Sequence, residues 1–204
     1  MDSLSQGLSV GVFSVQVSDQ NGCTATAQIQ IEQLPPVEIS MLSTPTSCFG
    51  RKDGTAVVNL LRGGDGGGDT TLYRYHWSVP GISPLQKYAR GLAAGRYYIT
   101  VSDLQGCSDR DSIVVLSPRL LQPILDARPA LCYQTASGSA RVMAIEGGNS
   151  GMFSYHWNTG DSTTLISNVG AGWYHLTLTD SKGCEGSDSI QVKEPPALTL
   201  QIFP

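Results

Sequence analysis

The sequence predicts an all-β protein made of repeated sandwich domains, and three observations support this prediction. A thirteen-residue segment occurs three times, as GVFSVQVSDQNGC, GRYYITVSDLQGC and GWYHLTLTDSKGC. Within each copy, apolar and polar side chains alternate, which is the period of a strand with one buried face. The 204 residues also include 23 glycines and 11 prolines, a composition typical of short strands joined by turns.

The three copies belong to a longer repeating unit. They begin at Gly11, Gly95 and Gly172, so successive copies are 84 and 77 residues apart. The cysteines Cys48 and Cys132 keep the first of these spacings. Repetition at this distance indicates tandem folded domains, because loops can absorb the difference in length.

Prolines fall at the joins between the repeats, where short and stiff connections are expected. We expect residues 1–35 to be the C-terminal part of a truncated first repeat, 36–118 and 119–198 to be full repeats, and 199–204 to begin a following segment. Each full repeat has room for about seven strands, with a buried tryptophan on the third. The sequence therefore predicts tandem immunoglobulin-like β-sandwich repeats.

The alternation also assigns side chains to the core of each repeat. The predicted inward stripes of the first full repeat are Tyr73, Tyr75 and Trp77, and Tyr97, Ile99 and Val101. Those of the second are Phe153, Tyr155 and Trp157, and Tyr174, Leu176 and Leu178. The truncated repeat contributes Phe13, Val15 and Val17, and we expect this stripe to lack an opposite sheet.

An ordered set of short motifs runs through each full repeat. In the first it reads Cys48-Phe49-Gly50, Asp53-Gly54, Gly63-Gly64, Tyr75-x-Trp77, Leu92–Tyr97 and Asp103–Cys107. The second departs from it at Cys132-Tyr133-Gln134 and at Val169. This order resembles the SprB-type repeat of large secreted surface adhesins of gliding and related Bacteroidota. The resemblance implies secretion by the type IX route, a place on the cell surface and no catalytic residues.

Several functional classes have no support in the sequence. The net charge of −4 is spread along the chain, so a nucleic-acid partner is not expected. No apolar run is long enough for a membrane span. The opening MDSLSQGL is not a signal peptide, so we interpret the chain as part of a longer protein. Because no catalytic motif occurs and His76, His156 and His175 should face solvent, we expect no enzyme and no cofactor.

We therefore expect a non-enzymatic fragment of an extracellular adhesin that acts as a rigid stalk or spacer. Its partners would be neighbouring repeats of the same chain, and surface glycans or other cell-surface proteins. The alternative is a carbohydrate-binding accessory module of a secreted protein, in which the outward-facing aromatics Trp173 and Tyr98 would contact the ligand. Because the repeats do not share these aromatics, the sequence favours the spacer.

Two further kinds of site are suggested by short patterns. An Asp followed by Ser or Thr and then by an apolar residue or Thr resembles the O-glycosylation signal of secreted Bacteroidota proteins. The candidate acceptors are Ser3, Thr70, Ser112, Ser162 and Ser189. The loop Gly63–Thr71 carries two aspartates among glycines, as calcium loops do. Since the second repeat has no acid in this loop, we interpret it as a flexible loop, and calcium binding stays an open question.

Five cysteines remain to be paired. In a secreted protein they should be oxidised where geometry permits. Pairing within repeats would join Cys48 to Cys107 and Cys132 to Cys184. In an immunoglobulin topology those cysteines lie at opposite ends of a sandwich, whereas a disulfide needs Cα atoms within about 7 Å. Head-to-tail stacking would instead join Cys48 to Cys184 between repeats and leave Cys23 and the others without a partner in this chain. Inter-repeat pairing, intra-repeat pairing and free thiols all remain open.

Overall fold

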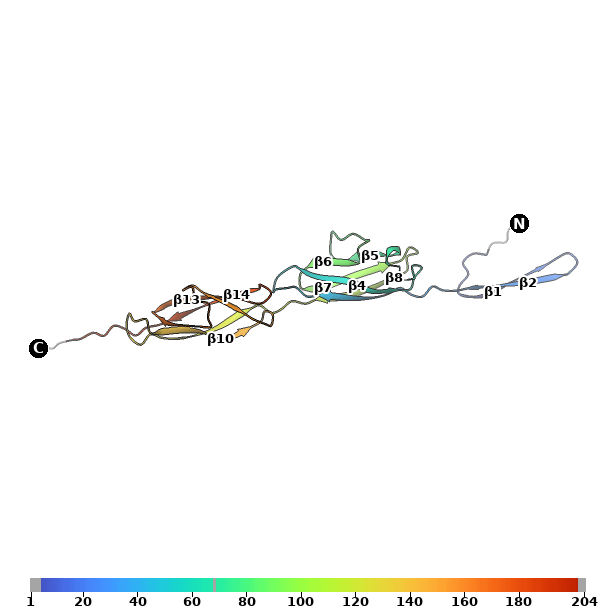
Figure 1. The fold of residues 1–204 in the computed structure, drawn as a ribbon. Helices are drawn as coiled ribbons and strands as arrows, with labels where there is room; N and C mark the ends of the chain where they lie inside the picture. Colours follow the sequence, from blue (N-terminus) through green and yellow to red (C-terminus); the bar gives the residue numbers. More distant parts are fainter. Residues whose placement is uncertain (1–4, 68, 202–204) are drawn as a thin grey trace.

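A computed structural model describes residues 5–67 and 69–201, which form a β-hairpin followed by two β-sandwiches (Figure 1). The three parts follow one another along one long axis, with the hairpin at one end and the second sandwich at the other. Each sandwich contains two three-stranded sheets. The described chain is therefore all-β with tandem immunoglobulin-like sandwiches, as the sequence predicts.

The first sandwich packs one sheet made of the strands β3, β4 and β6 against another made of β5, β7 and β8. The first sheet contains β3 (Glu38–Thr44), β4 (Gly54–Arg62) and β6 (Tyr88–Leu92). The second contains β5 (Arg74–Trp77), β7 (Gly95–Ser102) and β8 (Ser108–Val115). A short 3₁₀ helix, η1 (Thr70–Leu72), precedes β5.

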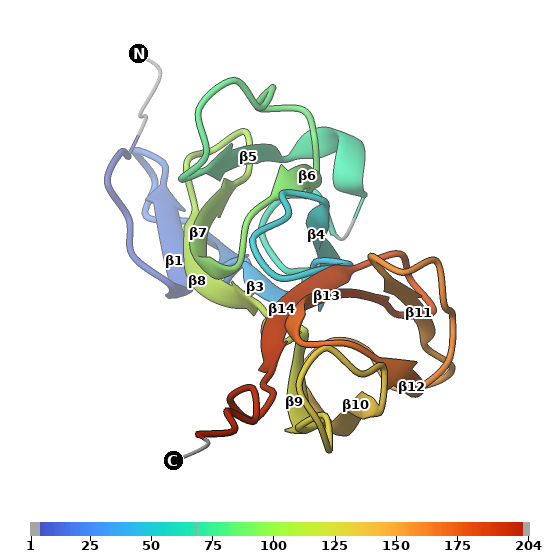
Figure 2. The ribbon, with the colours of Figure 1, turned by 90° about the vertical axis from the view of Figure 1, so that its left-hand side faces the viewer.

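The second sandwich repeats this arrangement strand for strand. Its sheets are β9 (Gln122–Arg128), β10 (Gly138–Glu146) and β12 (Leu165–Val169), and β11 (Ser154–Trp157), β13 (Gly172–Thr179) and β14 (Glu185–Val192). All neighbouring strands are antiparallel. Seen along the long axis, the second sandwich lies in front of the first and is displaced sideways from it (Figure 2).

The described residues of each sandwich form six strands, so the expectation of about seven was wrong by one. The missing strand would lie between β5 and β6, where the chain crosses from one sheet to the other. In the first sandwich this segment contains Pro80, Gly81 and Pro84, and proline cannot donate to a strand ladder. In the second sandwich the crossing 158–164 has no room for a strand of its own.

The inward stripes of the sequence are the cores of the sandwiches. Trp77 and Trp157 are buried at equivalent places, with 4% and 0% of their surface exposed. Each indole N–H donates to a backbone carbonyl of the crossing segment, to Gln86 over 3.1 Å and to Thr163 over 2.9 Å. A buried indole therefore keeps a hydrogen-bond partner in both sandwiches.

A tyrosine near the start of the fifth strand fixes the corner between the two sheets. The Tyr97 hydroxyl donates to the Ala93 carbonyl, and the Tyr174 hydroxyl donates to the Gly170 carbonyl, each over 2.9 Å. This is the tyrosine corner of immunoglobulin-like domains, in which the hydroxyl bonds to the backbone a few residues upstream. Phe13 stands at the same place in the hairpin and has no hydroxyl to make this bond.

The hairpin pairs β1 (Gly11–Ser18) with β2 (Thr24–Ile31), and no other sheet of the described residues packs against it. Val15 and Val17, which belong to its predicted inward stripe, are 60% and 63% exposed. Their counterparts Ile99 and Val101 are fully buried. The hairpin thus has the sequence of a sandwich edge without the sheet that would cover it.

We expect Tyr97→Phe to lower the free energy of unfolding of the first sandwich by about 0.5–1.5 kcal/mol, because the Ala93 carbonyl loses its donor. Urea denaturation followed by tryptophan fluorescence measures this change. Tyr98→Phe is the matched control, since the Tyr98 ring lies on the outer face and is 43% exposed. Equal stability of the two variants would contradict the corner's role.

Candidate functional site

The early cysteine of the first sandwich, Cys48, lies in a loop that is tied to both neighbouring strands. The Thr46 amide donates to the Leu116 carbonyl over 2.9 Å, which attaches the loop to the chain leaving β8. The Ser47 amide donates to Asp53 Oδ1 over 2.9 Å, and the Ser47 hydroxyl also bonds to this carboxylate. Cys48 is therefore held at the end of the sandwich that faces the second one.

The late cysteine of the second sandwich, Cys184, closes a turn that is organised by one carboxylate. Asp180 Oδ1 accepts the amides of Lys182 over 2.8 Å and Cys184 over 3.0 Å. Its backbone amide donates in turn to the Cys184 carbonyl over 2.9 Å. An aspartate side chain that satisfies the amides of its own turn is an Asx turn, and here it fixes the position of the cysteine.

The same turn occurs in all three copies of the repeated segment. Asp19 accepts the amide of Cys23, and Asp103 accepts the amide of Cys107, over 2.9 Å and 2.8 Å. In the two sandwiches the second carboxylate oxygen of the aspartate also accepts the backbone amide of the residue that follows the Gly-Gly turn. Asp103 accepts it from Asp65 over 3.1 Å, and Asp180 accepts it from Asn149 over 2.8 Å. The recurring Asp-x-x-Gly-Cys is therefore a structural motif that presents a cysteine.

These hydrogen bonds hold the two sandwich carboxylates in their charged form. Burial of Asp180 acts to raise its pKa, but the amides of Asn149 and Cys184, the Asn149 side chain and the amide of Lys182 act in the opposite direction and prevail. The pKa of Asp180 therefore falls from 3.8 to about 2. The pKa of Asp103 is also lowered, because its amide donors outweigh its burial.

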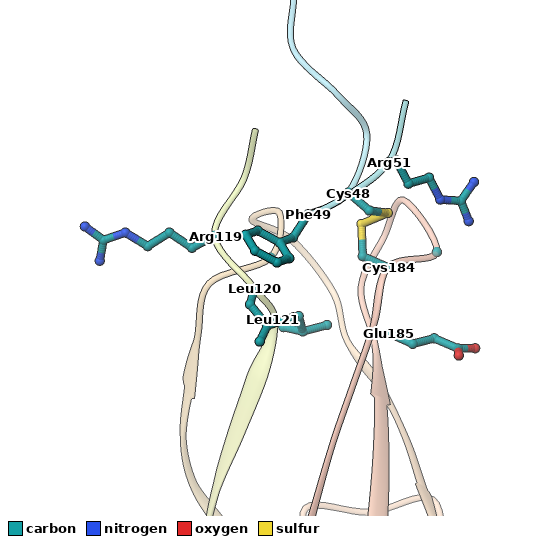
Figure 3. A pocket seen from close by; sticks show the side chains of 10 residues that line it. Cys48, Phe49, Arg51, Arg119, Leu120, Leu121, Cys184 and Glu185 are labelled. Carbon is teal, nitrogen blue, oxygen red and sulfur yellow. A yellow bond between two sulfur atoms is a disulfide. The ribbon is translucent and has the colours of Figure 1, made fainter. Parts of the chain in front are cut away.

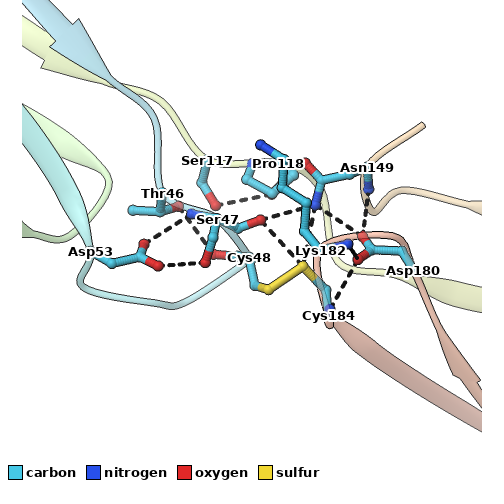
Figure 4. Close-up of a disulfide and its surroundings, with 10 residues drawn as sticks. All are labelled: Thr46, Ser47, Cys48, Asp53, Ser117, Pro118, Asn149, Asp180, Lys182 and Cys184. Atoms are coloured by element: carbon cyan, nitrogen blue, oxygen red, sulfur yellow. Dashed lines mark hydrogen bonds between the residues drawn. A yellow bond between two sulfur atoms is a disulfide. The ribbon is translucent and has the colours of Figure 1, made fainter. Parts of the chain in front are cut away.

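A disulfide between Cys48 and Cys184 joins the two sandwiches (Figure 4). The Cα atoms are 5.4 Å apart although the residues are 136 positions apart in the sequence. Both cysteines are buried, with 6% and 5% of their surface exposed. Among the alternatives left open by the sequence, the structure has the inter-repeat pair.

The intra-repeat pairs Cys48–Cys107 and Cys132–Cys184 are absent from the described chain, and strand direction gives the reason. A Cβ on Gly54, at the start of β4, would lie 2.5 Å from Val115, and Val115 pairs with the first residue of β7. The two strands therefore start at the same end. Cys48 precedes β4 and Cys107 follows β7, so about 25 Å of strand separates them.

Asn149 connects the two sandwiches beside the disulfide. Its side-chain amide donates to the Ser47 carbonyl of the first sandwich and to Asp180 Oδ2 of the second, each over 2.9 Å. The same nitrogen lies 3.2 Å from Cys184 Sγ. Asn149 therefore connects the Asp180 turn of the second sandwich to the Ser47 loop of the first by hydrogen bonds.

The linker between the sandwiches is attached at both of its ends. At its start, the Leu116 carbonyl accepts the backbone amide of Thr46 in the first sandwich. At its end, the Arg119 carbonyl accepts the backbone amide of Gly148 in the second sandwich over 2.9 Å. Leu121 is then buried, with 3% of its surface exposed. Gly147 must be glycine because it has φ of +69° and a Cβ there would lie 1.9 Å from the Leu120 carbonyl oxygen. Little of the linker is left free to bend.

A cavity of about 330 Å³ lies at this junction and draws its walls from both sandwiches (Figure 3). The first sandwich and the linker contribute Cys48, Phe49, Arg51, Arg119, Leu120 and Leu121. The second contributes Gly148, Gly183, Cys184 and Glu185. Figure 3 shows the side chains of Arg119, Arg51 and Glu185 pointing outward, so no charged groups converge in the cavity.

The two candidate ligand-facing aromatics are exposed but are not brought together. Trp173 is 58% exposed on β13 and Tyr98 is 43% exposed on β7. They lie in different sandwiches and at different positions of the repeat, because His175 is the equivalent of Tyr98. Arg110 also covers the Tyr98 ring, with its guanidinium carbon 5.3 Å from the ring centre. The two aromatics do not form one surface.

The candidate glycosylation sites differ in their surroundings. Thr70 and Ser162 are exposed, while Ser112 and Ser189 are half-buried at equivalent positions of β8 and β14. The Ser112 hydroxyl also accepts a hydrogen bond from Arg96 over 3.0 Å. Ser3 lies outside the described residues.

The Gly63–Thr71 loop uses its two aspartates in local structure. The amide of Asp65 donates to Asp103, and Asp69 caps η1 by accepting the amide and hydroxyl of Thr71 over 3.0 and 2.8 Å. Within residues 5–67 and 69–201, no three acidic, histidine or cysteine side chains are grouped as metal ligands. His76, His156 and His175 are exposed.

Sequence reasoning identified both cysteines of the junction and missed its polar partner. Asn149 carried no signal of its own, because the equivalent residue after the Gly-Gly turn of the first sandwich is Asp65. The signal that could have found it is the position itself, since a polar residue follows the paired glycines in both repeats. Its partner, the Ser47 carbonyl, is a backbone group that a sequence cannot reveal.

No family model and no curated protein matches this chain. Among solved structures, it is similar to a C-terminal fragment of intimin in complex with the intimin-binding domain of the translocated intimin receptor, with 12% identity and a TM-score of 0.36. It is also similar to immunoglobulin domains 1–5 of Sidekick-1 and to the N-terminal eight immunoglobulin domains of Down syndrome cell adhesion molecule, with 10% and 12% identity and TM-scores of 0.37 and 0.36.

The matches cover most of this chain and a smaller part of the others. They span 78%, 91% and 91% of this chain, and 64%, 46% and 28% of the intimin fragment, Sidekick-1 and the Down syndrome molecule. At these TM-scores the fold assignment rests on the strand pairings of the chain itself. The part of the chain that the structure describes has no helix with the length and hydropathy needed to cross a membrane.

We expect Asp180→Asn to lower the free energy of unfolding of the second sandwich by about 1.5–3 kcal/mol at pH 7. The backbone amides that donate to the charged Asp180 carboxylate would then have only a neutral side-chain amide as acceptor. The folded-state pKa lies below the ordinary value, so the stabilisation is complete above about pH 4 and is lost as the pH falls towards 2. The difference between wild type and variant in urea midpoint should shrink over this interval. Asp19→Asn is the control, since its turn lies in the separate hairpin, and a difference independent of pH would refute the assignment.

Proposed function

We propose that this chain is a non-enzymatic segment of a secreted cell-surface adhesin and that its repeats act as a rigid spacer. The order of motifs that resembles SprB-type repeats supports a parent protein of this kind. The segment would lie outside the cell, where disulfides persist. Its partners along the rod are the neighbouring repeats.

The observation that carries the proposal is the attachment of the two sandwiches to each other at separate points. The Cys48–Cys184 disulfide joins loops on either side of the junction, and Asn149 adds a hydrogen bond across it. The linker is held on both sides as well. A connection made at several points resists bending and twisting, whereas a single flexible linker permits both.

The rival function, a carbohydrate-binding module, has weaker support. Such a site needs polar and aromatic groups that converge on a ligand. Trp173 and Tyr98 lie in different sandwiches, and the junction cavity has a glycine-rich wall and outward-pointing charged side chains. The arrangement therefore favours a spacer over a ligand-binding module.

We expect the double variant Cys48→Ser/Cys184→Ser to lose the fixed angle between the sandwiches, because only the linker and Asn149 then connect them. Small-angle X-ray scattering should show a broader distribution of maximum dimensions. The free energy of unfolding should also fall by about 2–4 kcal/mol, as for other disulfides. Cys107→Ser/Cys132→Ser is the matched control because both of these thiols are free and exposed. Identical scattering of the two double variants would argue against a rigid spacer.

We also expect hexose-containing additions at Thr70, Ser112, Ser162 or Ser189 in protein purified from its native host, because a secreted surface protein of this type would pass through a glycosylation pathway. Ser112 and Ser189 should be modified together, since they occupy equivalent strand positions. Intact-mass and peptide mass spectrometry check this. Unmodified residues at all four positions in native material would remove this part of the proposal, and recombinant protein serves as the unmodified standard.

A further inference from the structure

The early cysteine of the second sandwich, Cys132, lies in a loop with the same internal geometry as the Cys48 loop. The amide of Thr135 donates to the Cys132 carbonyl over 3.3 Å, as the amide of Arg51 donates to the Cys48 carbonyl over 3.2 Å. Gln134 adopts φ of +55°, where the Cys48 loop has a glycine at +75°. A residue other than glycine is strained in this conformation, so the loop keeps the junction shape at an energetic cost.

The chain that leaves the second sandwich is attached to this loop as the linker is attached at the junction. The Ala130 amide donates to the Lys193 carbonyl over 2.8 Å, as Thr46 does to Leu116 over 2.9 Å. Leu121 comes six residues after the end of β8 in the first sandwich. Leu198 comes six residues after the end of β14 in the second. At the same position after the hairpin stands Val37, which is 5% exposed.

The burial of these equivalent residues differs sharply. Leu121 is 3% exposed because it is inserted into the second sandwich, whereas Leu198 is 103% exposed. Leu200, two residues further on and so on the same face of an extended chain, is 88% exposed. Two leucines with the spacing of a first strand are thus left in solvent, and they have the register that would begin a further sandwich.

A cavity of about 440 Å³ at this end repeats half of the junction cavity. Its walls are Leu131, Cys132, Tyr133, Pro195, Pro196, Ala197 and Leu198. Cys132 and Tyr133 correspond to Cys48 and Phe49 of the junction, and the chain up to Leu198 corresponds to the linker up to Leu121. At the junction the remaining wall is the Asp-x-x-Gly-Cys turn of the next sandwich, including Cys184.

We propose that the end of the second sandwich is a docking site for the Asp-x-x-Gly-Cys turn of a further repeat, whose cysteine forms a disulfide with Cys132. The Leu131 carbonyl then takes the place of the Ser47 carbonyl as acceptor from the residue after the Gly-Gly turn. Leu198 and Leu200 enter the core of the docked repeat. This extends the proposed rod by one junction, and the rod described above does not depend on it.

The chemistry of the new bond requires an oxidant. The two thiols lose two protons and two electrons as the sulfur–sulfur bond forms. A disulfide such as oxidised glutathione accepts both through thiol–disulfide exchange and is released as two molecules of the reduced thiol. Cys132 is exposed and free in this chain, so such an oxidant can reach it.

The test uses the chain through Gln201, extended by a second copy of residues 125–201. Leu198 and Leu200 then take the places of Leu121 and Pro123 in the copied repeat. The copied repeat carries Cys132→Ser, so that the original Cys132 alone gives its peptide. It also carries Gln191→Thr as a mass label, because Gln191 is exposed on β14. After refolding in a glutathione redox buffer, peptide mapping without reduction should find Cys132 linked to the labelled Cys184 peptide. The unlabelled Cys184 peptide should remain linked to Cys48, and alkylation of Cys132 should be lost.

Two results would overturn the proposal. One is a Cys132 that is still alkylated while Cys48–Cys184 has formed, and the other is a link from Cys132 to Cys23 or Cys107 of a second molecule. Should the copied repeat fail to fold, a second extension places residues 37–118 after Ala197, with Cys107→Ser in the original repeat and Cys48→Ser in the copy. No link to Cys132 in either extension also counts against the proposal.

The matched control is Cys132→Ser in the extended chain, which should leave the labelled cysteine open to alkylation and Cys48–Cys184 unchanged. Failure of this proposal is distinguishable from failure of the spacer function. If Cys132 stays reduced in the extended chain, small-angle X-ray scattering of the original chain should still show a rigid pair of sandwiches. If the spacer proposal fails, the original chain itself should scatter as a flexible pair.

Discussion

The carboxylate of the Asp-x-x-Gly-Cys turn is the constraint on which the junction depends. By accepting the amide of the cysteine it fixes where the sulfur points, and by accepting the amide after the Gly-Gly turn it joins two loops of one sandwich. Asn149 then connects this carboxylate to the facing sandwich. The disulfide joins two loops whose local shape these hydrogen bonds fix, and it adds a covalent link to a junction that is otherwise held by the linker and by single hydrogen bonds.

Much of this fold can be predicted from the sequence, because period-two alternation is a direct consequence of strand geometry. The alternating stripes place Trp77, Trp157 and their neighbours in the core. The tyrosine corner was not expected from the sequence and is seen only in the structure. The number of strands is harder to predict. Whether the segment after β5 forms a seventh strand depends on its prolines and on its length. The alternation of apolar and polar residues contains no information about these two factors.

The junction is less predictable than the cores. Strand direction excludes pairing within a sandwich, and this argument needs only the order of strands and the positions of the cysteines. The partners of Asn149 and of the linker are backbone carbonyls of Ser47 and Arg119, and every residue has such a group. Contacts of this kind become visible only when the two sandwiches are placed against each other.

The disulfide also decides how the chain carries tension. A pull on the two ends passes along β3 to Cys48, crosses to Cys184 and leaves through β14. The residues between the two cysteines, which are 136 positions apart, lie outside this path and are not stretched. At roughly 3.3–3.6 Å per extended residue, about 450 Å of chain is thereby withheld from extension. A sandwich in this segment can lose its fold under load without any large increase in length, and it can refold in place when the load is removed.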